Sequence, residues 1–311
     1  LFSMLLALVS AVFVWQIGKP ADFIATTQVG FLIPDSPAQK AGLLIGDKII
    51  AINGVKVTGF AGSLDSVTEN IVLSRGKEIS YTVEREGASE PITLRSGFET
   101  EKTQWFQRGG LRQVGIMPAG NAIVGKVSPN SPAADAGITA GDKILSVDGF
   151  KLYSLQQFSQ YLRDQKWKTV RLGLQTAAGG TRDVEVTPER PLKPSGFDPM
   201  VGIQWGDGGE VDTRIVHPGP IRQVTDSLKM MWTTITSVMA SDSSIGVGHL
   251  SGPVGIAKLQ YQLLQMDDGW RRILAFMVLF NVNLAVLNMM PFPVLDGGHI
   301  TLAILEKIFG R

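Results

Sequence analysis

Two stretches of the sequence that lie 95 residues apart are copies of one another. Residues 36–57 read SPAQKAGLLIGDKIIAINGVKV and residues 131–152 read SPAADAGITAGDKILSVDGFKL, so 11 of 22 positions are identical without a gap. The pairs Val29-Gly30 and Val124-Gly125 keep the same offset of 95. Because tandem copies of one domain are the economical explanation of such a repeat, we predict two similar domains, over residues 22–118 and 119–208.

Each copy predicts a small α+β domain with short strands. The Ser-Pro-Ala segment favours a helical turn, and the Gly-Asp-Lys-Ile segment that follows leads into a strand. The pairs Asn53-Gly54 and Asp148-Gly149 then supply the positive φ angles that tight hairpin turns require. Apolar residues at helical spacing predict a later helix in each copy, near residues 63–75 and 154–164.

The composition excludes two classes of function. The formal net charge is +1, which argues against nucleic acid as a partner because phosphate binding usually leaves a basic surface. The chain has no cysteine, so disulfides and thiolate metal sites are excluded, whereas a reducing and an oxidising compartment both remain open.

Two apolar segments predict membrane helices and a lipid bilayer as partner. Residues 1–18 carry no charge and nearly reach the length that spans a bilayer, so we predict a transmembrane helix over 1–19. A signal-peptide core is the alternative, and the apolar start at Leu1 suggests that natural sequence precedes it. The second helix is predicted over 271–290, with a buried soluble helix as the alternative; its three asparagines would face a protein interior or an aqueous site.

Residues 218–241 predict an amphipathic helix. Its apolar residues fall on one helical face: Ile221, Val224, Leu228, Met231, Trp232, Ile235, Val238 and Met239. Such a helix could lie along a membrane surface or pack on the rest of the protein. We expect a mixture, a helix that is braced on the membrane helices near the interface.

A single carboxylate follows the second apolar segment, in the sequence NMMPFPVLDGGH at residues 288–299. Asp296 could cap the next helix, relay protons or bind a metal ion. Pro291 and Pro293 interrupt the helix, and irregular backbone at membrane depth is tolerated only where it is buried in protein or lines a cavity. This interruption favours a functional site that combines the carboxylate with the amide of Asn288.

Two short matches after the repeated stretches resemble the carboxylate-binding loop of PDZ domains. They are Gln113-Val114-Gly115-Ile116 and Met200-Val201-Gly202-Ile203. Their position resembles the bacterial PDZ domains with circularly shifted element order, which are small, partly open β-barrels. The resemblance implies that peptide C-termini bind there by strand addition, with ordinary edge strands as the alternative. The implied peptide-binding residues are Val114, Gly115, Ile116, Val201, Gly202 and Ile203.

The motif Asn288-x-x-Pro291-x-Pro293-x-Leu295-Asp296-Gly297 resembles the signature of the site-2 family of intramembrane zinc proteases, and Ser251-Gly252-Pro253 is also similar to that family. With two PDZ-like domains before the last apolar segment, the chain resembles the regulator of sigma-E protease branch. The resemblance implies a multi-pass protein of the bacterial inner membrane with periplasmic PDZ domains.

The same resemblance implies roles for particular residues and for the repeats. Asp296, in the motif and following helix over 291–311, would be the third zinc ligand, and Asn288, Pro291 and Pro293 would hold the substrate. The substrate would be a transmembrane protein similar to an anti-sigma factor, already shortened by another protease. The PDZ pair would act as a size filter.

The sequence departs from that family at the other metal ligands. The family supplies two histidines from an H-E-x-x-H helix, whereas the three histidines here, His217, His249 and His299, do not form that motif. We therefore expect a fragment that lacks the first and last membrane helices and neither holds zinc tightly nor cleaves peptides alone. A substitute site of His299 and Asp296 has too few ligands, and His217 and His249 are expected at a surface or interface.

A membrane-tethered double-PDZ scaffold without catalysis is the alternative from another class. It explains the repeat and the missing H-E-x-x-H, but it leaves Asn288, the two prolines and Asp296 unexplained. An H-E-x-x-H motif encoded in an apolar helix upstream of Leu1 would decide for the protease. The sequence does not identify the substrate, its cleavage site, the groove that binds a ligand or the oligomeric state.

Overall fold

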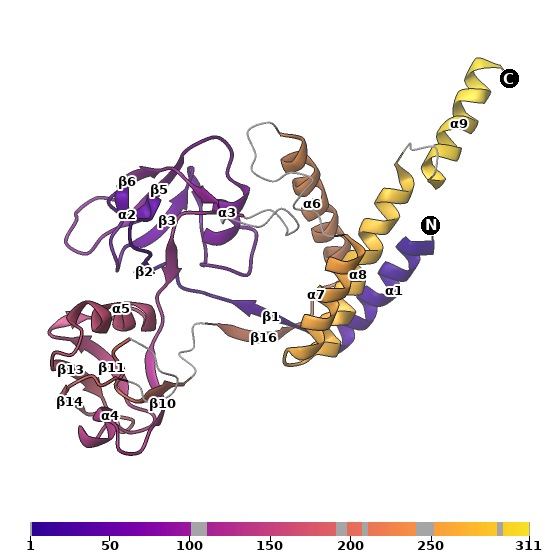
Figure 1. Cartoon of the computed structure of the whole chain (residues 1–311). Coiled ribbons are helices and arrows are strands. Elements are labelled where there is room, and N and C mark those ends of the chain that lie inside the picture. Colours follow the sequence, from indigo (N-terminus) through magenta and orange to yellow (C-terminus); the bar gives the residue numbers. More distant parts are fainter. Residues whose placement is uncertain are drawn as a thin grey trace. The chain divides into compact units, whose positions relative to one another are not determined.

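The computed structural model describes residues 2–100, 111–190, 198–206, 211–240, 252–290 and 295–310. The chain divides into two compact units. The repeat unit contains Asp22–Glu101 and Leu111–Asp212, and the described residues of the helical unit are those up to Ala21 and those from Thr213 onward. Strands β1 (Lys19–Phe23) and β16 (Asp212–Val216) pair with each other, and the boundary between the units falls within both strands (Figure 1).

The first repeat domain is a set of short strands with two short helices. Its elements in chain order are β2 (Val29–Leu32), α2 (Pro37–Lys40), β3 (Lys48–Ile52), β4 (Val55–Lys56), α3 (Val67–Leu73), β5 (Ile79–Glu84), β6 (Ile92–Ser96), β7 (Glu99–Thr100), β8 (Arg112–Gln113) and β9 (Ile116–Pro118). Four strands form a sheet in the order β4-β3-β5-β6, and β2-β9 and β7-β8 form two-stranded sheets. The helix predicted near 63–75 is shorter, because it begins only after the N-cap Ser66.

The second repeat domain has the same order of elements up to its last strand. These are β10 (Ala122–Val127), α4 (Pro132–Asp135), β11 (Lys143–Val147), β12 (Phe150–Lys151), α5 (Leu155–Gln165), β13 (Val170–Gln175), β14 (Thr181–Val186) and β15 (Ile203–Trp205). The strands form one sheet in the order β14-β13-β11-β10-β15, and β12 pairs with β11. In both repeats the last strand therefore pairs with the first strand of its own domain, β9 with β2 and β15 with β10.

Shared residues build the shared turns of the two domains. Ser36 and Ser131 cap α2 and α4, each accepting a hydrogen bond from a backbone N–H three residues on, as N-cap serines do. Asn53 and Asp148 have φ angles of 49° and 47° in the hairpins β3-β4 and β11-β12. Local sequence therefore determines these corners in both copies.

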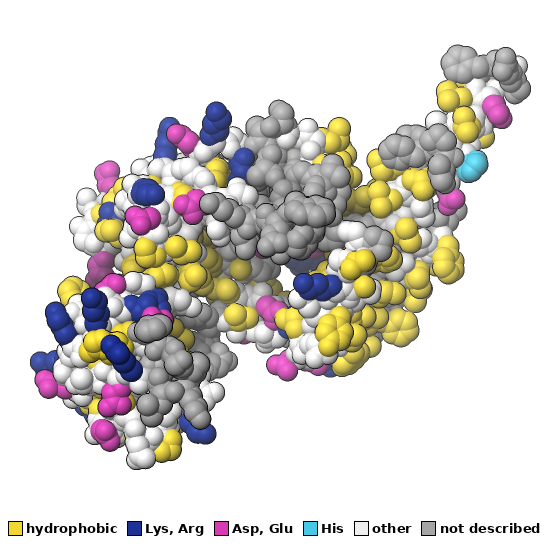
Figure 2. Space-filling model, viewed as in Figure 1, with side chains coloured by type: hydrophobic (Ala, Val, Ile, Leu, Met, Phe, Trp, Pro, Cys, Tyr) yellow, Lys and Arg dark blue, Asp and Glu magenta, His cyan; other side chains and the backbone are white. Residues whose placement is uncertain are grey.

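The helical unit is built on the contact of α1 (Phe2–Ile17) with α8 (Gly269–Met289). The side of α1 that is buried carries three small residues, Ala7, Ser10 and Ala11, and Val14. The side chains of Val278 and Val282 on α8 complete this apolar cluster. The larger apolar residues of α1, such as Phe2 and Phe13, are exposed. Small residues inside and large apolar residues outside are typical of helices that pack in lipid, and Figure 2 shows apolar side chains gathered over these helices.

One helix of the described part, α8, is long and apolar enough to cross a membrane, and α1 is apolar but shorter. The first helix ends at Ile17, so Lys19, predicted inside the helical segment 1–19, begins β1. The unit also contains α7 (Pro253–Gln265) and α9 (Asp296–Phe309).

Helix α6 (Pro220–Met239) packs on α1 and α8, and among its residues of described burial the two buried ones are polar. Gln223 and Ser227 are buried, whereas Ile221, Trp232 and Met239 are 71%, 69% and 81% exposed. The Gln223 Nε2 donates hydrogen bonds to the carbonyl oxygens of Ala11 and Pro218, at 2.9 and 2.7 Å. The contact of α6 with α1 and α8 agrees with the expected helix braced on the apolar helices, and Val224 of the apolar stripe packs against their cluster. The hydrogen bond from Gln223 to Ala11 adds a polar contact between helices.

Candidate functional site

The carboxylate of Asp296 lies at the first residue of α9. The helix is preceded by Leu295 as N-cap, and no side-chain capping hydrogen bond is present. The capping alternative for Asp296 is therefore wrong, because the residue stands inside the first turn and its exposed side chain does not bond to the helix N–H groups. An acid in this turn is nevertheless favourable, since the helix dipole places positive charge there.

A close contact of backbones holds this first turn against the end of α8. A Cβ atom added to Gly297 would lie 2.3 Å from the carbonyl oxygen of Met289 and 2.6 Å from that of Met290. Such approaches are possible only for glycine. The glycine after Asp296 is thus explained by packing, and it fixes the carboxylate next to the C-terminal end of the apolar helix.

Of the other residues predicted for this site, the structure describes only Asn288. Asn288 is half-buried one residue before the end of α8, whereas Pro291 and Pro293 lie outside the described residues. Two further asparagines of α8 turn toward protein: Asn281 donates to the carbonyl oxygen of Met277 at 2.8 Å, and the buried Asn283 Oδ1 has no hydrogen-bond partner among the described residues.

The described residues do not by themselves form a zinc site. His299 is exposed one turn after Asp296, and His217 Nδ1 lies 2.9 Å from the carbonyl oxygen of Trp15, at the C-terminal end of α1. His249 lies outside the described residues. No group of three or more His, Asp or Glu side chains is placed to hold a metal ion within the described part. Since a protein zinc site uses three or four ligands, Asp296 fits the role of one ligand and no more.

The two predicted peptide-binding loops occupy equivalent places in the two repeats. Gly115 and Gly202 each have a φ of 80°. A Cβ on either would lie 2.3 Å from the Cβ of a serine, Ser36 in one domain and Ser131 in the other. Both loops are therefore fixed against the N-terminus of a short helix, and both require glycine.

Within these loops only some groups can face a ligand. Val114 and Val201 are 1% and 4% exposed and belong to the two apolar cores, so their side chains are structural. Their carbonyl oxygens accept hydrogen bonds from Ala38 N and Ala133 N at 3.0 and 2.9 Å. Ile116 and Ile203 are half-buried, and each opens the edge strand that follows its loop.

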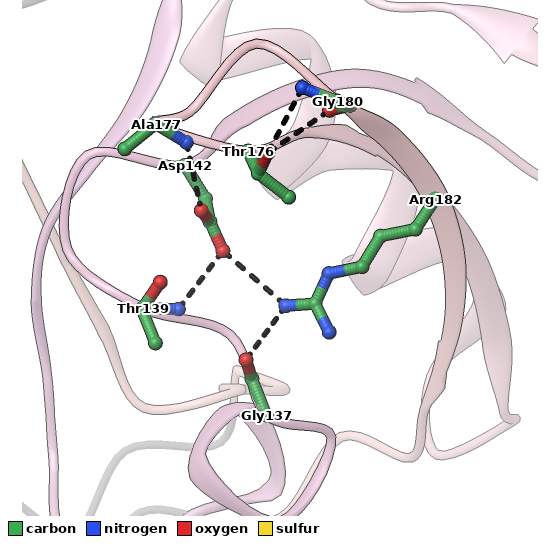
Figure 3. Close-up of polar contacts among 7 residues, drawn as sticks. All are labelled: Gly137, Thr139, Asp142, Thr176, Ala177, Gly180 and Arg182. Atoms are coloured by element: carbon green, nitrogen blue, oxygen red, sulfur yellow. Dashed lines mark hydrogen bonds and ion pairs between the residues drawn. The ribbon is translucent and has the colours of Figure 1, made fainter.

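A buried aspartate in each Gly-Asp pair closes the turn before the second strand of its repeat, a role that the sequence did not reveal. Figure 3 shows Asp142, which accepts hydrogen bonds from Thr139 N at 3.0 Å, Ala177 N at 3.3 Å and Arg182 Nη2 at 3.4 Å. The same guanidinium donates to the carbonyl oxygen of Gly137 at 2.6 Å. The matching position of the two aspartates in the repeat was the available signal, but their arginine partners come from different strands and loops.

Comparison with known proteins identifies the family. The "Regulator of sigma-E protease RseP" of Escherichia coli is 29% identical over 301 residues, which cover 91% of this chain and 64% of that protein. The "Regulator of sigma E protease" of Salmonella typhimurium is 27% identical over 296 residues, with the same coverage of 91% and 64%. The chain thus spans slightly less than two thirds of the length of these relatives.

The solved structures that match include the PDZ domain of an SdrC-like protein from Listeria innocua. It is 26% identical, covers 27% of this chain and 92% of that chain, and has a TM-score of 0.25. The sequence profile of peptidase family M50 matches residues 1–311, the full extent of the sequence. The chain therefore belongs to peptidase family M50, as a member of the site-2 protease family.

Proposed function

We propose that this protein acts as an intramembrane zinc endopeptidase in which Asp296 contributes one metal ligand. The family match over residues 1–311 supports the activity class. The observation that carries the assignment of Asp296 is its place at the start of α9, uncommitted to a cap and fixed by Gly297 against the end of the apolar α8. The remaining ligands would come from residues that the described ranges do not contain.

The neighbouring residues would position an extended substrate segment. Asn288 lies half-buried near the end of α8, where a polar side chain at membrane depth is costly unless it finds a partner. We assign to its amide, with Pro291 and Pro293, the holding of the substrate backbone. The substrate class would be a transmembrane protein similar to an anti-sigma factor, since relatives are named as regulators of sigma E.

The membrane and the repeats complete the proposal. Helix α1, with Ala7, Ser10 and Ala11 buried and large apolar residues exposed, and helix α8, which is long and apolar enough to cross a membrane, fit a multi-pass protein of the bacterial inner membrane. The two repeats would be periplasmic, circularly permuted PDZ-like domains, and they would bind extended segments and exclude substrates with bulky domains. The positive φ of Gly115 and Gly202 and the last-to-first strand pairing support this assignment.

The test compares two acids of helix α9 in the full-length gene product. Asp296→Asn keeps the size of the side chain but weakens it as a metal ligand, so we expect loss of cleavage of a model single-span membrane substrate and a lower zinc content. Glu306→Gln is the matched control, because Glu306 is an exposed acid on the same helix, and it should retain both. Gel-based cleavage and atomic absorption measure the two quantities.

Retained cleavage in Asp296→Asn would show that Asp296 is not a metal ligand. If the full-length wild-type protein neither binds zinc nor cleaves any membrane substrate, the membrane-tethered scaffold with two peptide-binding domains replaces the protease. These two results are distinguishable, because the first concerns one residue and the second concerns the activity.

A further inference from the structure

The last strand of each repeat has one edge without a strand partner among the described residues. In the first repeat β9 pairs with β2, and in the second β15 pairs with β10. An open edge is where an extended chain can add as another strand, through backbone N–H and C=O groups that point outward. The ability of each edge to bind such a chain depends on which N–H groups of β9 and β15 point outward.

In the first repeat the outward edge lacks a donor. Gly115 O accepts from Ile33 N at 2.8 Å and Ala119 N donates to Gln28 O at 2.8 Å, so residues 115, 117 and 119 face β2. Because successive residues of a strand alternate in direction, Ile116 and Pro118 face outward. Pro118 has no N–H, so this edge offers the donor of Ile116 but none at the next outward position. Outward proline is a common means of blocking strand addition.

In the second repeat both outward donors are present. Gly202 O accepts from Ser128 N at 2.8 Å and Gly206 N donates to Ile123 O at 2.9 Å, so these residues face β10. The same alternation turns the N–H groups of Ile203 and Trp205 outward. The ring of Trp205 meets the buried Phe158 of α5 edge-on, with centroids 5.5 Å apart, and this contact holds the strand beside the helix.

The helix that follows the β-hairpin also differs in length. Helix α3 has 7 residues and α5 has 11, which correspond to about 10 and 16 Å of helix. An extended chain advances about 3.3 Å per residue, so α5 can flank about five residues of a bound segment and α3 about three. The second repeat thus has both the longer helix, α5, and a last strand, β15, whose two outward-facing residues each have an N–H group.

In the first repeat, Arg112 links the strand before the glycine loop to the end of α3. Arg112 of β8 donates from Nη1 to the carbonyl oxygen of Ser74 at 2.9 Å, and its guanidinium lies 4.5 Å from the centre of the Phe98 ring. Ser74 is the C-cap of α3. The strand before the glycine loop is therefore tied to the end of the helix that would form the other wall of a groove.

We propose that the second repeat is the peptide-binding one: an extended polypeptide segment adds as a strand to β15 and places apolar side chains against Ile203 and Leu155, while the edge of the first repeat is closed and structural. Both side chains are half-buried and pack on the core of that domain. The inference rests on the proposed function, because it specifies which of the two PDZ-like domains binds the segment.

The test uses the full chain in detergent micelles and a fluorescein-labelled peptide of eight alternating Thr and Val residues with a free C-terminal carboxylate. Ile203→Pro and Ile116→Pro remove equivalent outward donors from the two repeats. We expect Ile203→Pro to weaken binding about three- to tenfold, the effect of one hydrogen bond, and Ile116→Pro to leave it unchanged. Fluorescence polarisation measures the affinity, and hydrogen exchange at β10 and β2 checks that each domain remains folded.

Two further comparisons separate the backbone from the side chains. Trp205→Pro should bind about three- to tenfold more weakly than Trp205→Val, because both lose the ring and only proline loses the donor. Peptides N-methylated on all Thr or on all Val residues should differ, since one set blocks the bonds to β15 and the other faces away. An amidated peptide tests whether the free carboxylate adds affinity.

Weaker binding by Ile116→Pro with no effect of Ile203→Pro would overturn the proposal, and so would equal binding of the two N-methylated peptides. Absence of saturable binding of the unmodified peptide would also overturn it. The protease assignment is measured separately, as Asp296-dependent cleavage of a membrane substrate by the full-length gene product. Loss of peptide binding with cleavage intact would therefore contradict this inference alone.

Discussion

The two repeats have the same Gly-Asp pair but bind its carboxylate differently. In the first repeat Arg85 donates to both oxygens of Asp47, from Nε and Nη2 at 2.7 Å each, and Leu44 N adds a third bond at 2.9 Å. In the second repeat Arg182 reaches Asp142 with one nitrogen at 3.4 Å, and backbone N–H groups supply the other bonds (Figure 3). Paired, charge-assisted bonds are the stronger kind. Both repeats thus keep the buried aspartate and an arginine partner, but the arginine comes from a different position in each repeat.

The largest expected difference between the repeats comes from removing these aspartates. Asp47→Ala should lower the free energy of unfolding of the first repeat by about 3 kcal/mol and Asp142→Ala that of the second by about 2 kcal/mol, because each removes a buried carboxylate and the hydrogen bonds that it accepts. Hydrogen exchange with mass spectrometry on the full chain measures both, in β3-β5 and in β11-β13.

An exposed ion pair provides the control for that comparison. Glu84→Ala removes the pair with Lys48, whose side chains are 54% and 58% exposed, so it should cost less than about 0.5 kcal/mol. An equal effect of the two aspartate substitutions would show that the paired guanidinium contact adds nothing to the first repeat.

The next difference concerns the serines that cap the two longer helices. Ser154 Oγ accepts from Gln157 N at 3.1 Å and also donates to the carbonyl oxygen of Gly30, in the other repeat, at 2.8 Å. Ser66 Oγ bonds only to Glu69, among the described contacts. Ser154→Ala should cost about 1–2 kcal/mol and speed hydrogen exchange in β2 as well as in α5.

Ser66→Ala is the matched variant, and its effect should stay within the first repeat. If Ser154→Ala changes exchange in α5 but leaves β2 at the wild-type rate, the hydrogen bond to Gly30 does not couple the two repeats. Both serines are fully buried, so the two substitutions remove the same atom from comparable surroundings.

The smallest difference is one of pH, since Glu69 occupies the capping-box position that Gln157 has in the second repeat. Burial raises the pKa of Glu69 above its usual value. A raised folded-state pKa means that its stabilising contribution is complete below the unfolded pKa, near 4.3, and is lost as the pH rises through the folded value. Protection of α3 from hydrogen exchange should therefore increase slightly as the pH falls from 7. In α5 the same position is Gln157, which does not titrate, so this pH dependence is not expected there.

Glu69→Gln tests this assignment with the residue that the second repeat uses. The pH-dependent part of α3 protection, after correction for intrinsic exchange rates, should disappear in the variant. The expected size is a fraction of a kcal/mol because Glu69 is only half-buried and solvent screens it. An unchanged pH profile would assign the dependence to another carboxyl group.

The sequence carried most of the information about local structure. Ser-Pro-Ala gave capped helical turns at Ser36 and Ser131, and Asn53-Gly54 and Asp148-Gly149 gave hairpins with positive φ, because these preferences are set within a few residues. It was less reliable where only packing decides. In α6 the apolar pattern did not indicate that Gln223 and Ser227 are buried while Trp232 is exposed. Asp296 stands after the N-cap of α9.

The sequence by itself determined that the chain contains two copies of one domain between apolar segments, and that one carboxylate follows the second apolar segment. Repetition and periodicity are properties of the chain alone. Only the tertiary structure decided which edge atoms face outward, because the direction of Pro118 and Trp205 depends on the register with β2 and β10. It also decided that Gly297 lies against the end of α8, since that contact joins two helices through backbone atoms that no side-chain pattern records.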